Sequence, residues 1–358
     1  MSPTFTSGKL KQMMIPIDKI ADDVVDYVAE RAKTDPVLDF KPITGGFTLD
    51  TVGHVAFGIK SNCHKGEDKE FMKSAADIFQ TLDLNSWVNL VATWFFNLFP
   101  GSITYLGIWP ESAQKLRKMT HEVIDHRNQN NTPEVGDFID RLREFKKVAE
   151  HPITDKMIDA QGMVFLSAGY ESTANTIGSM IYICATQPEI QEKIVQEICD
   201  EIGSDEICHD SISKLNFLEA CIMETLRMYP PFTDHFRTCT KDSVVNGIKV
   251  KKGTMIRMPN YPAHFDPEFF PEPEKFKPER FFKENADKLV PYTWRPFGSG
   301  NRVCIAQRFA ILEIKIFMAK LLAKLKVSAT PKTKHGDCIG TMFMISYPNM
   351  FVKVEPRY

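Results

Sequence analysis

The sequence predicts a mainly α-helical protein with small β-sheets, and three observations support this fold class. Residues 155–186 form one apolar stretch that is far longer than a strand and must run through the interior as a helix. Residues 213–228 repeat apolar side chains at helical spacing. Turn signals, among them Asn246-Gly247, concentrate between residues 242 and 261, where we therefore expect short strands.

The composition predicts a globular chain with a large core. Its 358 residues suggest about two domains by length alone, but no stretch divides the chain, so we predict a single domain, residues 1–358. A net charge of -2 gives no overall field to recruit nucleic acid or an anionic membrane. The eight cysteines include no C-x-x-C pair, which argues against a zinc site and a disulfide framework. There is no signal peptide at Met1 and no apolar run of the roughly 18 residues that a membrane span needs.

The first half of the chain predicts several helices in order. Residues 17–28 have helical spacing, and residues 47–58 end in a glycine that predicts a helix stop. Residues 87–109 are the most apolar stretch, which is either a buried helix and loop or a surface that dips into a membrane interface. Residues 110–127 predict a charged amphipathic helix, and residues 128–133 resemble a linker.

The second half predicts the longest helix and then the small β region. Thr154 is the expected N-cap of the helix over residues 155–186, and Gln187-Pro188 is expected to end it. Further helices are predicted over residues 189–202 and from Ser213 onward. Residues 254–258 read as a strand.

The stretch from Phe297 to Ala306 is the centre of the chemistry that the sequence predicts. Gly298 and Gly300, two residues apart, predict a tight bulge that uses positive φ. A helix is expected to resume just after Cys304, and its N-terminus should favour the thiolate over the thiol. A thiolate held in this way is a ligand for a soft or redox metal.

Phe297, Gly300, Arg302 and Cys304 match the F-x-x-G-x-R-x-C signature of the cytochrome P-450 superfamily, the haem-thiolate monooxygenases. The chain resembles animal microsomal members of the family-three type over essentially its whole length. The resemblance implies the cytochrome P-450 fold and haem b as cofactor, with Cys304 as the iron ligand and Phe297 beside the haem. It also implies that Arg302 and Arg237 bind the haem propionates. Ala306 stands where the signature has glycine, a departure that removes no ligand.

Residues 168–173 resemble the A-G-x-[DE]-T-T segment of the family's central helix, where the backbone opens into a groove for dioxygen at Ala168 and Gly169. Ser172 stands in place of the usual threonine and would relay protons together with its neighbours Glu171 and Thr173. Without the resemblance, Gly169 would be interpreted first as a close helix–helix contact.

The resemblance also implies a buried ion cluster and a substrate pocket. Glu224, Arg227 and Arg280 match the Glu-Arg-Arg triad that holds the loop before the cysteine. The pocket above the haem would be lined by Phe165, Ala168, Phe232, Phe236, Thr341 and Met342.

The function implied is insertion of one atom of dioxygen into an apolar steroid, lipid or xenobiotic, with electrons from a flavoprotein reductase. Arg308, Lys315, Lys320 and Lys324 would form part of a basic face for that reductase, or simply a solvated helix face. Nucleic acid is not an expected partner. A full-length relative would lie on the cytosolic face of the endoplasmic reticulum membrane, with peripheral contact through residues 87–109. A cysteine hydrolase is disfavoured, because no histidine relay accompanies Cys304.

The opening of the chain resembles the segment that follows the C helix in those members. We therefore expect the membrane anchor, the N-terminal sheet strands and the helix preceding Met1 to be absent, and expect weak haem binding and aggregation from such a chain. The alternative to a monooxygenase is a truncated, non-catalytic fragment or isoform that acts only as a partner-binding helical scaffold.

Overall fold

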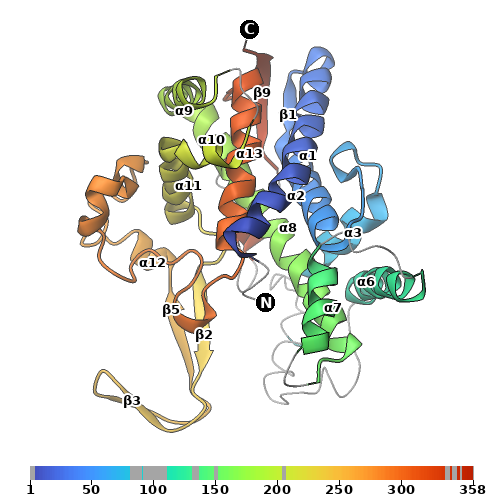
Figure 1. Cartoon of the computed structure of the whole chain (residues 1–358). Helices are drawn as coiled ribbons and strands as arrows, with labels where there is room; N and C mark the ends of the chain where they lie inside the picture. The colour runs from blue at the N-terminus through green and yellow to red at the C-terminus, as the bar shows by residue number, and fades with distance from the viewer. Residues whose placement is uncertain are drawn as a thin grey trace.

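The computed structural model describes residues 5–80, 91, 111–130, 137–148, 152–203, 207–334, 339–340, 345–346 and 349–357. Within these ranges the chain is mainly helical with small antiparallel sheets, so the predicted fold class is confirmed (Figure 1). The α-helices are α1 (Ser7–Thr34), α2 (Phe40–Phe57), α3 (Lys69–Gln80), α6 (Glu111–Asn130), α7 (Phe138–Val148), α8 (Asp155–Thr186), α9 (Pro188–Glu201), α10 (His209–Lys214), α11 (Asn216–Met228), α12 (Tyr261–His264) and α13 (Gln307–Lys324). Four short 3-10 helices accompany them: η2 (Cys63–Lys65), η3 (Pro278–Phe281), η4 (Lys283–Lys288) and η5 (Gly300–Arg302).

Helix α8 runs through the interior, as its apolar composition predicts. It begins after Thr154, whose side chain accepts a hydrogen bond from the Met157 N–H, and it ends at Gln187. Helices α2, α9, α11 and α13 all contact it, and α1 packs on α2 and α13 (Figure 1). Its bounds agree with the prediction from sequence because cap, apolar run and terminal Gln-Pro are all local signals.

Helices α2 and α8 approach each other closely at Gly169. A Cβ at this position would lie 2.8 Å from Cγ2 of Val52, so glycine makes the helix–helix contact possible. Helix α8 continues through this turn without a break. The close contact that the sequence alone left open is therefore present, and no interruption of the helix accompanies it.

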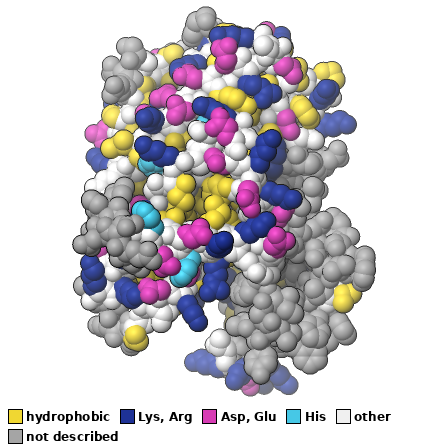
Figure 2. All heavy atoms as spheres, turned by 90° about the vertical axis from the view of Figure 1, so that its right-hand side faces the viewer, with side chains coloured by type: hydrophobic (Ala, Val, Ile, Leu, Met, Phe, Trp, Pro, Cys, Tyr) yellow, Lys and Arg dark blue, Asp and Glu magenta, His cyan; other side chains and the backbone are white. Residues whose placement is uncertain are grey.

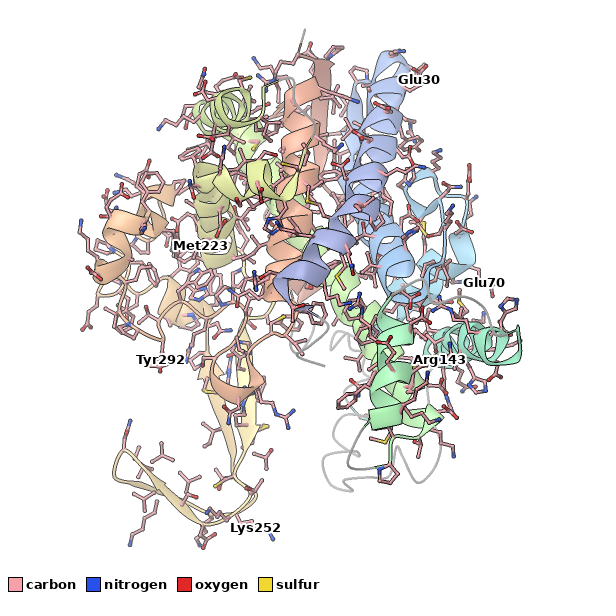
Figure 3. All side chains as sticks on the ribbon, in the orientation of Figure 1. Glu30, Glu70, Arg143, Met223, Lys252 and Tyr292 are labelled. Carbon is pink, nitrogen blue, oxygen red and sulfur yellow. The ribbon has the colours of Figure 1, made fainter. Side chains whose placement is uncertain are left out.

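In the described part of the chain, the strands form four small antiparallel sheets. β9 (Phe351–Pro356) pairs with β1 (Val37–Asp39) and with β6 (Leu325–Ser328), while β7 (Ile339–Gly340) pairs with β8 (Ile345–Ser346). β2 (Asp234–Thr238) pairs with β5 (Met255–Pro259), and β3 (Ser243–Val245) with β4 (Ile248–Val250). The predicted turn is confirmed, since Asn246 and Gly247 have φ of 48° and 79° between β3 and β4. This hairpin projects from the helical body, with Lys252 near its base (Figure 3).

Several predicted boundaries need correction. Helix α2 ends at Phe57 with Gly58 at φ 64°, as predicted, but it begins at Phe40 rather than Phe47. Ser213 does not begin a helix, because it lies inside α10. The helical conformation is interrupted at Leu215, before α11 begins. Helix α6 reaches Asn130, into the stretch that resembled a linker. No helix in the described part of the chain is long and apolar enough to cross a membrane.

Candidate functional site

The loop that carries Cys304 has the bulged backbone that its glycines predict. Gly298 and Gly300 have φ of 77° and 69°, and Gly300 opens the short helix η5. The backbone N–H of Cys304 donates to the Phe297 carbonyl at 2.8 Å, which closes the loop on itself. Helix α13 resumes at Gln307, so the cysteine is held between a closed loop and a helix start.

The side chains around the sulfur leave it accessible. Cys304 is exposed, and the flanking apolar side chains Val303 and Ile305 are 45% and 43% exposed. Desolvation by the surrounding protein raises the pKa of the Cys304 thiol, while a hydrogen bond from the backbone of Ala306 lowers it. The prediction that the helix start makes the polypeptide favour the thiolate is therefore wrong, because desolvation outweighs the local backbone donor.

Both predicted propionate ligands lie at the surface with free donors. Arg302 is exposed in η5 and has no hydrogen bond or ion pair to any described residue. Arg237 is exposed on β2, and its Nη1 donates only to the Phe236 carbonyl, at 2.8 Å. Each guanidinium thus keeps most of its donor fork available for an anion.

The central helix presents one open stripe. Val164, Ala168 and Ser172 follow at i, i+4 spacing, so they share a face of α8; Val164 is 58% exposed and Ala168 is also exposed. The Ser172 hydroxyl donates back to the Ala168 carbonyl at 2.7 Å. Thr173 is buried, only 4% exposed, so the two hydroxyls of the motif lie in different surroundings.

Glu171 is buried and faces away from that stripe, toward α2. Its Oε1 forms an ion pair with the Lys41 ammonium, which also donates to Asn175 Oδ1 at 2.8 Å. The Lys41 side chain is 19% exposed, so it connects the buried carboxylate to the surface. The sequence analysis missed Lys41, and it had no signal to find it, because 130 residues separate the two partners.

The structure brings Glu224, Arg227 and Arg280 together at the end of α11. Glu224 and Arg227 are fully buried, with Nε to Oε2 at 2.7 Å and Nη2 to Oε1 at 2.9 Å. Arg280 Nε donates to Glu224 Oε1 at 3.3 Å, and so does the Lys277 backbone N–H at 2.9 Å. The Glu224 carboxylate therefore accepts hydrogen bonds from two guanidinium groups and from one backbone N–H.

His264 joins this ion cluster to the cysteine loop, and the sequence analysis missed it. Its Nδ1 donates to the Arg227 carbonyl at 3.0 Å, which leaves Nε2 to accept from the Arg295 N–H at 3.1 Å. Burial lowers the pKa of His264 to about 4, so the ring is neutral at neutral pH, as the accepting nitrogen requires. Arg295 lies two residues before Phe297, so His264 positions the start of the loop.

Two further contacts hold the same loop. Trp294 Nε1 donates at 3.2 Å to the carbonyl of Met223, whose position on α11 is labelled in Figure 3. His235 Nε2 donates to the Arg295 carbonyl at 3.0 Å from β2. Both contacts anchor the chain just before Phe297.

The basic face predicted on α13 is mostly neutralised. Lys315 is buried and pairs with Glu219 at 2.9 Å, and Lys320 pairs with Asp18 at 3.0 Å and with Asp22 at 2.6 Å. Lys324 pairs with Asp26 at 2.8 Å, and Arg308 donates to the Ser7 hydroxyl at 3.0 Å. Acids of α1 and α11 therefore pair with the three lysines, whereas Arg308 contacts an uncharged hydroxyl. The three lysines do not form the free basic face that was predicted as one alternative.

The predicted pocket residues are only partly gathered. Phe165 stacks on Phe138 with ring centroids 4.6 Å apart and also lies 6.3 Å from the Phe309 ring of α13. Phe232 and Phe236 are half-buried at the start of β2. Thr341 and Met342 lie outside the described residues, and so does the apolar stretch 87–109 apart from Val91, which is 56% exposed.

Comparison with known proteins decides the family. The family model for cytochrome P-450 matches residues 1–354. The chain belongs to the cytochrome P-450 family. Its relatives include cytochrome P-450 3A6 of Oryctolagus cuniculus, 30% identical over 340 residues that cover 93% of this chain and 68% of the relative. Cytochrome P-450 3A31 of Mesocricetus auratus is 30% identical over 372 residues, covering 100% of this chain and 72% of the relative. The protein is thus a haem-dependent monooxygenase, an oxidoreductase that takes dioxygen, small-molecule substrates and electrons from a redox partner.

The residues present fit a haem. Among the described residues no group of three or more His, Cys, Asp or Glu side chains could hold a metal ion. A single accessible thiol suits a cytochrome P-450 haem, because the porphyrin itself supplies the in-plane ligands. The exposed apolar Val303 and Ile305 beside Cys304 would contact the ring, and Arg302 has a free guanidinium for a carboxylate.

Proposed function

We propose that this cytochrome P-450 oxidises apolar organic molecules of steroid, lipid or xenobiotic type, with electrons from a flavoprotein reductase. The observation that carries the proposal is the closed loop that presents the accessible Cys304 sulfur between Val303 and Ile305. When bound, the haem supplies activation of dioxygen at its iron. The chain would supply the cysteine ligand, the anchors for the propionates and the shape of the pocket.

Cys304 would ligate the iron, and Arg302 and Arg237 would bind the propionates. Support comes from the unpaired sulfur and the two exposed guanidinium groups in the loop and on β2. The ion cluster of Glu224, Arg227 and Arg280 holds this loop through His264 and Trp294. These residues position the ligand and do not touch the reacting atoms.

Ser172 holds a proton at Oγ on the open stripe of α8, one turn from Ala168. Glu171 links this turn to solvent from the other side of the helix, where its carboxylate pairs with Lys41, whose side chain reaches the surface. Gly169 lets α2 pack against this turn, which keeps Lys41 within reach of Glu171. Thr173 is a buried support of the same turn.

The apolar side chains Val164, Phe232 and Phe236 favour an apolar substrate. We propose that residues 1–358 act as a single domain, and that the protein works at the cytosolic face of the endoplasmic reticulum membrane with peripheral contact through residues 87–109. A flavoprotein reductase must use a face other than the neutralised lysines of α13. Figure 2 shows acidic and basic side chains mixed over one side of the protein, so on this side no field of one sign would steer a partner.

The absorption spectrum of the reduced protein under carbon monoxide tests the assignment of Cys304. We expect a strongly red-shifted Soret band, because the thiolate donates electron density to the iron. Cys304→Ser should abolish the shift, whereas Cys239→Ser, a half-buried cysteine on the strand side of the molecule, should keep it. An unchanged spectrum in Cys304→Ser would remove Cys304 from the site.

A further inference from the structure

A surface cavity lies between α1 and the loop that follows α2. Its volume is about 400 Å³. The lining comes from residues 15–23 of α1, from the end of α2 and from residues 59–62. None of these residues belongs to α8, α11, α13 or the cysteine loop, so the cavity is separate from the proposed haem site. It has the size of a small-molecule site.

Four polar side chains of this cavity have no partner among the described residues. The side chains of Lys19, Asp23, His54 and Lys60 make no hydrogen bond or ion pair with any residue in the described part of the chain. Lys19 and Asp23 are exposed on α1, and Lys60 is exposed on the facing loop. Burial lowers the pKa of His54, the positive charges of Lys60 and Lys19 lower it further, and the negative charge of Asp137 partly offsets them. Both ammonium groups therefore act on one point of the cavity.

The second acid of the lining, Asp50, is turned inward. Its carboxylate accepts from the Ser61 hydroxyl at 2.6 Å, from the Cys63 N–H at 2.8 Å and from His64 Nδ1 at 2.6 Å. The charges left for a ligand are therefore two lysines against the single carboxylate of Asp23. Asp50 keeps its own negative charge, so the lining as a whole is close to neutral and suits a ligand with one small anionic group better than a phosphate dianion.

The walls beside these charges are apolar. Ile15 is 74% exposed, and Pro16 and Ile20 continue the same edge of α1. Ile59 faces them from the loop. An exposed apolar edge that runs into a cavity marks a binding groove.

We propose that this cavity binds an amphipathic carboxylate, such as a fatty acid, with the carboxylate between Lys19 and Lys60 and the apolar body along Ile15 and Ile20. The His54 ring, neutral and unpaired, is available to donate one hydrogen bond to the same carboxylate. Such a ligand would join α1 to the loop after α2, far in the chain from the proposed iron ligand. The site does not depend on the proposed function, because no residue of the haem site takes part.

Dodecanoate, below its micelle concentration, is the probe for the experiment on the full, haem-loaded chain. Acetylation of lysines, read by mass spectrometry, should slow at least about threefold at Lys19 and Lys60 when dodecanoate is present. Lys326, exposed on β6 and unpaired among the described residues, is the internal control and should not change. Methyl dodecanoate has the same chain without the charge and should protect neither lysine.

Affinity measured by calorimetry gives the second readout. Lys19→Glu with Lys60→Glu should weaken dodecanoate binding about tenfold, while Lys326→Glu leaves it unchanged. Lysine-to-arginine changes at both positions should keep it, since the charge is retained. Equal protection by the methyl ester, no protection at either lysine, or unchanged affinity in the double variant would each overturn the proposal. Haem content and the carbon monoxide spectrum should be the same in all variants, which separates this result from the test of Cys304.

Discussion

Replacement of Glu224 by glutamine should destabilise the protein severely, although the shape of the side chain hardly changes. Arg227 is fully buried, and its guanidinium also donates to the carbonyls of His264 at 2.8 Å and Pro273 at 2.7 Å. Carbonyl oxygens satisfy its N–H groups but carry no full charge. Glu224 is therefore the only carboxylate among the described residues that neutralises this cation, and it also receives Arg280.

The size of the effect follows from an unpaired buried charge. Loss of one partner of a buried ion pair costs about 3–5 kcal/mol, against a typical total stability of about 5–15 kcal/mol. We expect Glu224→Gln to lower the free energy of unfolding in urea by about 3–5 kcal/mol. Haem content should fall as well, because His264 and the cysteine loop are held by the same cluster.

Two controls make the measurement decisive. Glu201→Gln removes an exposed acid that lies 3.9 Å from Lys214, and it should change stability by less than about 1 kcal/mol. Glu224→Gln with Arg227→Met removes both charges and should recover part of the loss. If Glu224→Gln were no worse than Glu201→Gln, the buried charge argument would be refuted.

Three other predictions follow from the core and the central helix. Gly169→Ala should lower the free energy of unfolding by about 1–3 kcal/mol, because the new Cβ would press on Val52. Val52→Ala in the same chain should restore part of this loss. If the two substitutions changed the free energy of unfolding in urea additively, the contact would be contradicted. The pKa of His264 is about 4 in the folded protein, below its unfolded value of 6.5. The neutral ring therefore contributes roughly 3 kcal/mol to the free energy of unfolding above pH 6.5, and this contribution is lost as the pH falls toward 4. A His264→Gln variant that loses the same stability in acid would disprove this. Ser172→Ala should keep haem but yield less product per reductant consumed, unlike Thr186→Ala at the far end of α8; equal yields would exclude Ser172 from the relay.

The sequence predicted those parts of the fold whose cause is local. Thr154 caps α8, Gly58 ends α2 and Asn246-Gly247 turns the hairpin, each through the conformation of a few adjacent residues. The interruption of the helix at Leu215 was not predicted, because the apolar spacing continues across it into α11. Periodicity indicates which face is buried, but it does not show whether the backbone is continuous.

The site was predictable in its identity but not in its electrostatics. The motif residues Cys304, Glu224 and Arg227 could be named from the resemblance to the cytochrome P-450 family, whereas Lys41 lies 130 residues from Glu171 and carries no motif. The raised pKa of Cys304 depends on desolvation by atoms around it, which spacing does not reveal. The same holds for Lys315, whose burial beside Glu219 is a property of the packed helices.

The ion cluster on α11 also determines the order in which this part of the protein can assemble during synthesis. Glu224 and Arg227 emerge from the ribosome together and can pair within one helical turn, but Arg280 follows 56 residues later. At a synthesis rate of about 5–20 residues per second, α11 waits roughly 3–11 s for its last partner. The cysteine loop comes later still, and its start is fixed only when His264 and Trp294 have docked on α11. Haem capture must therefore be one of the final steps in the maturation of the chain.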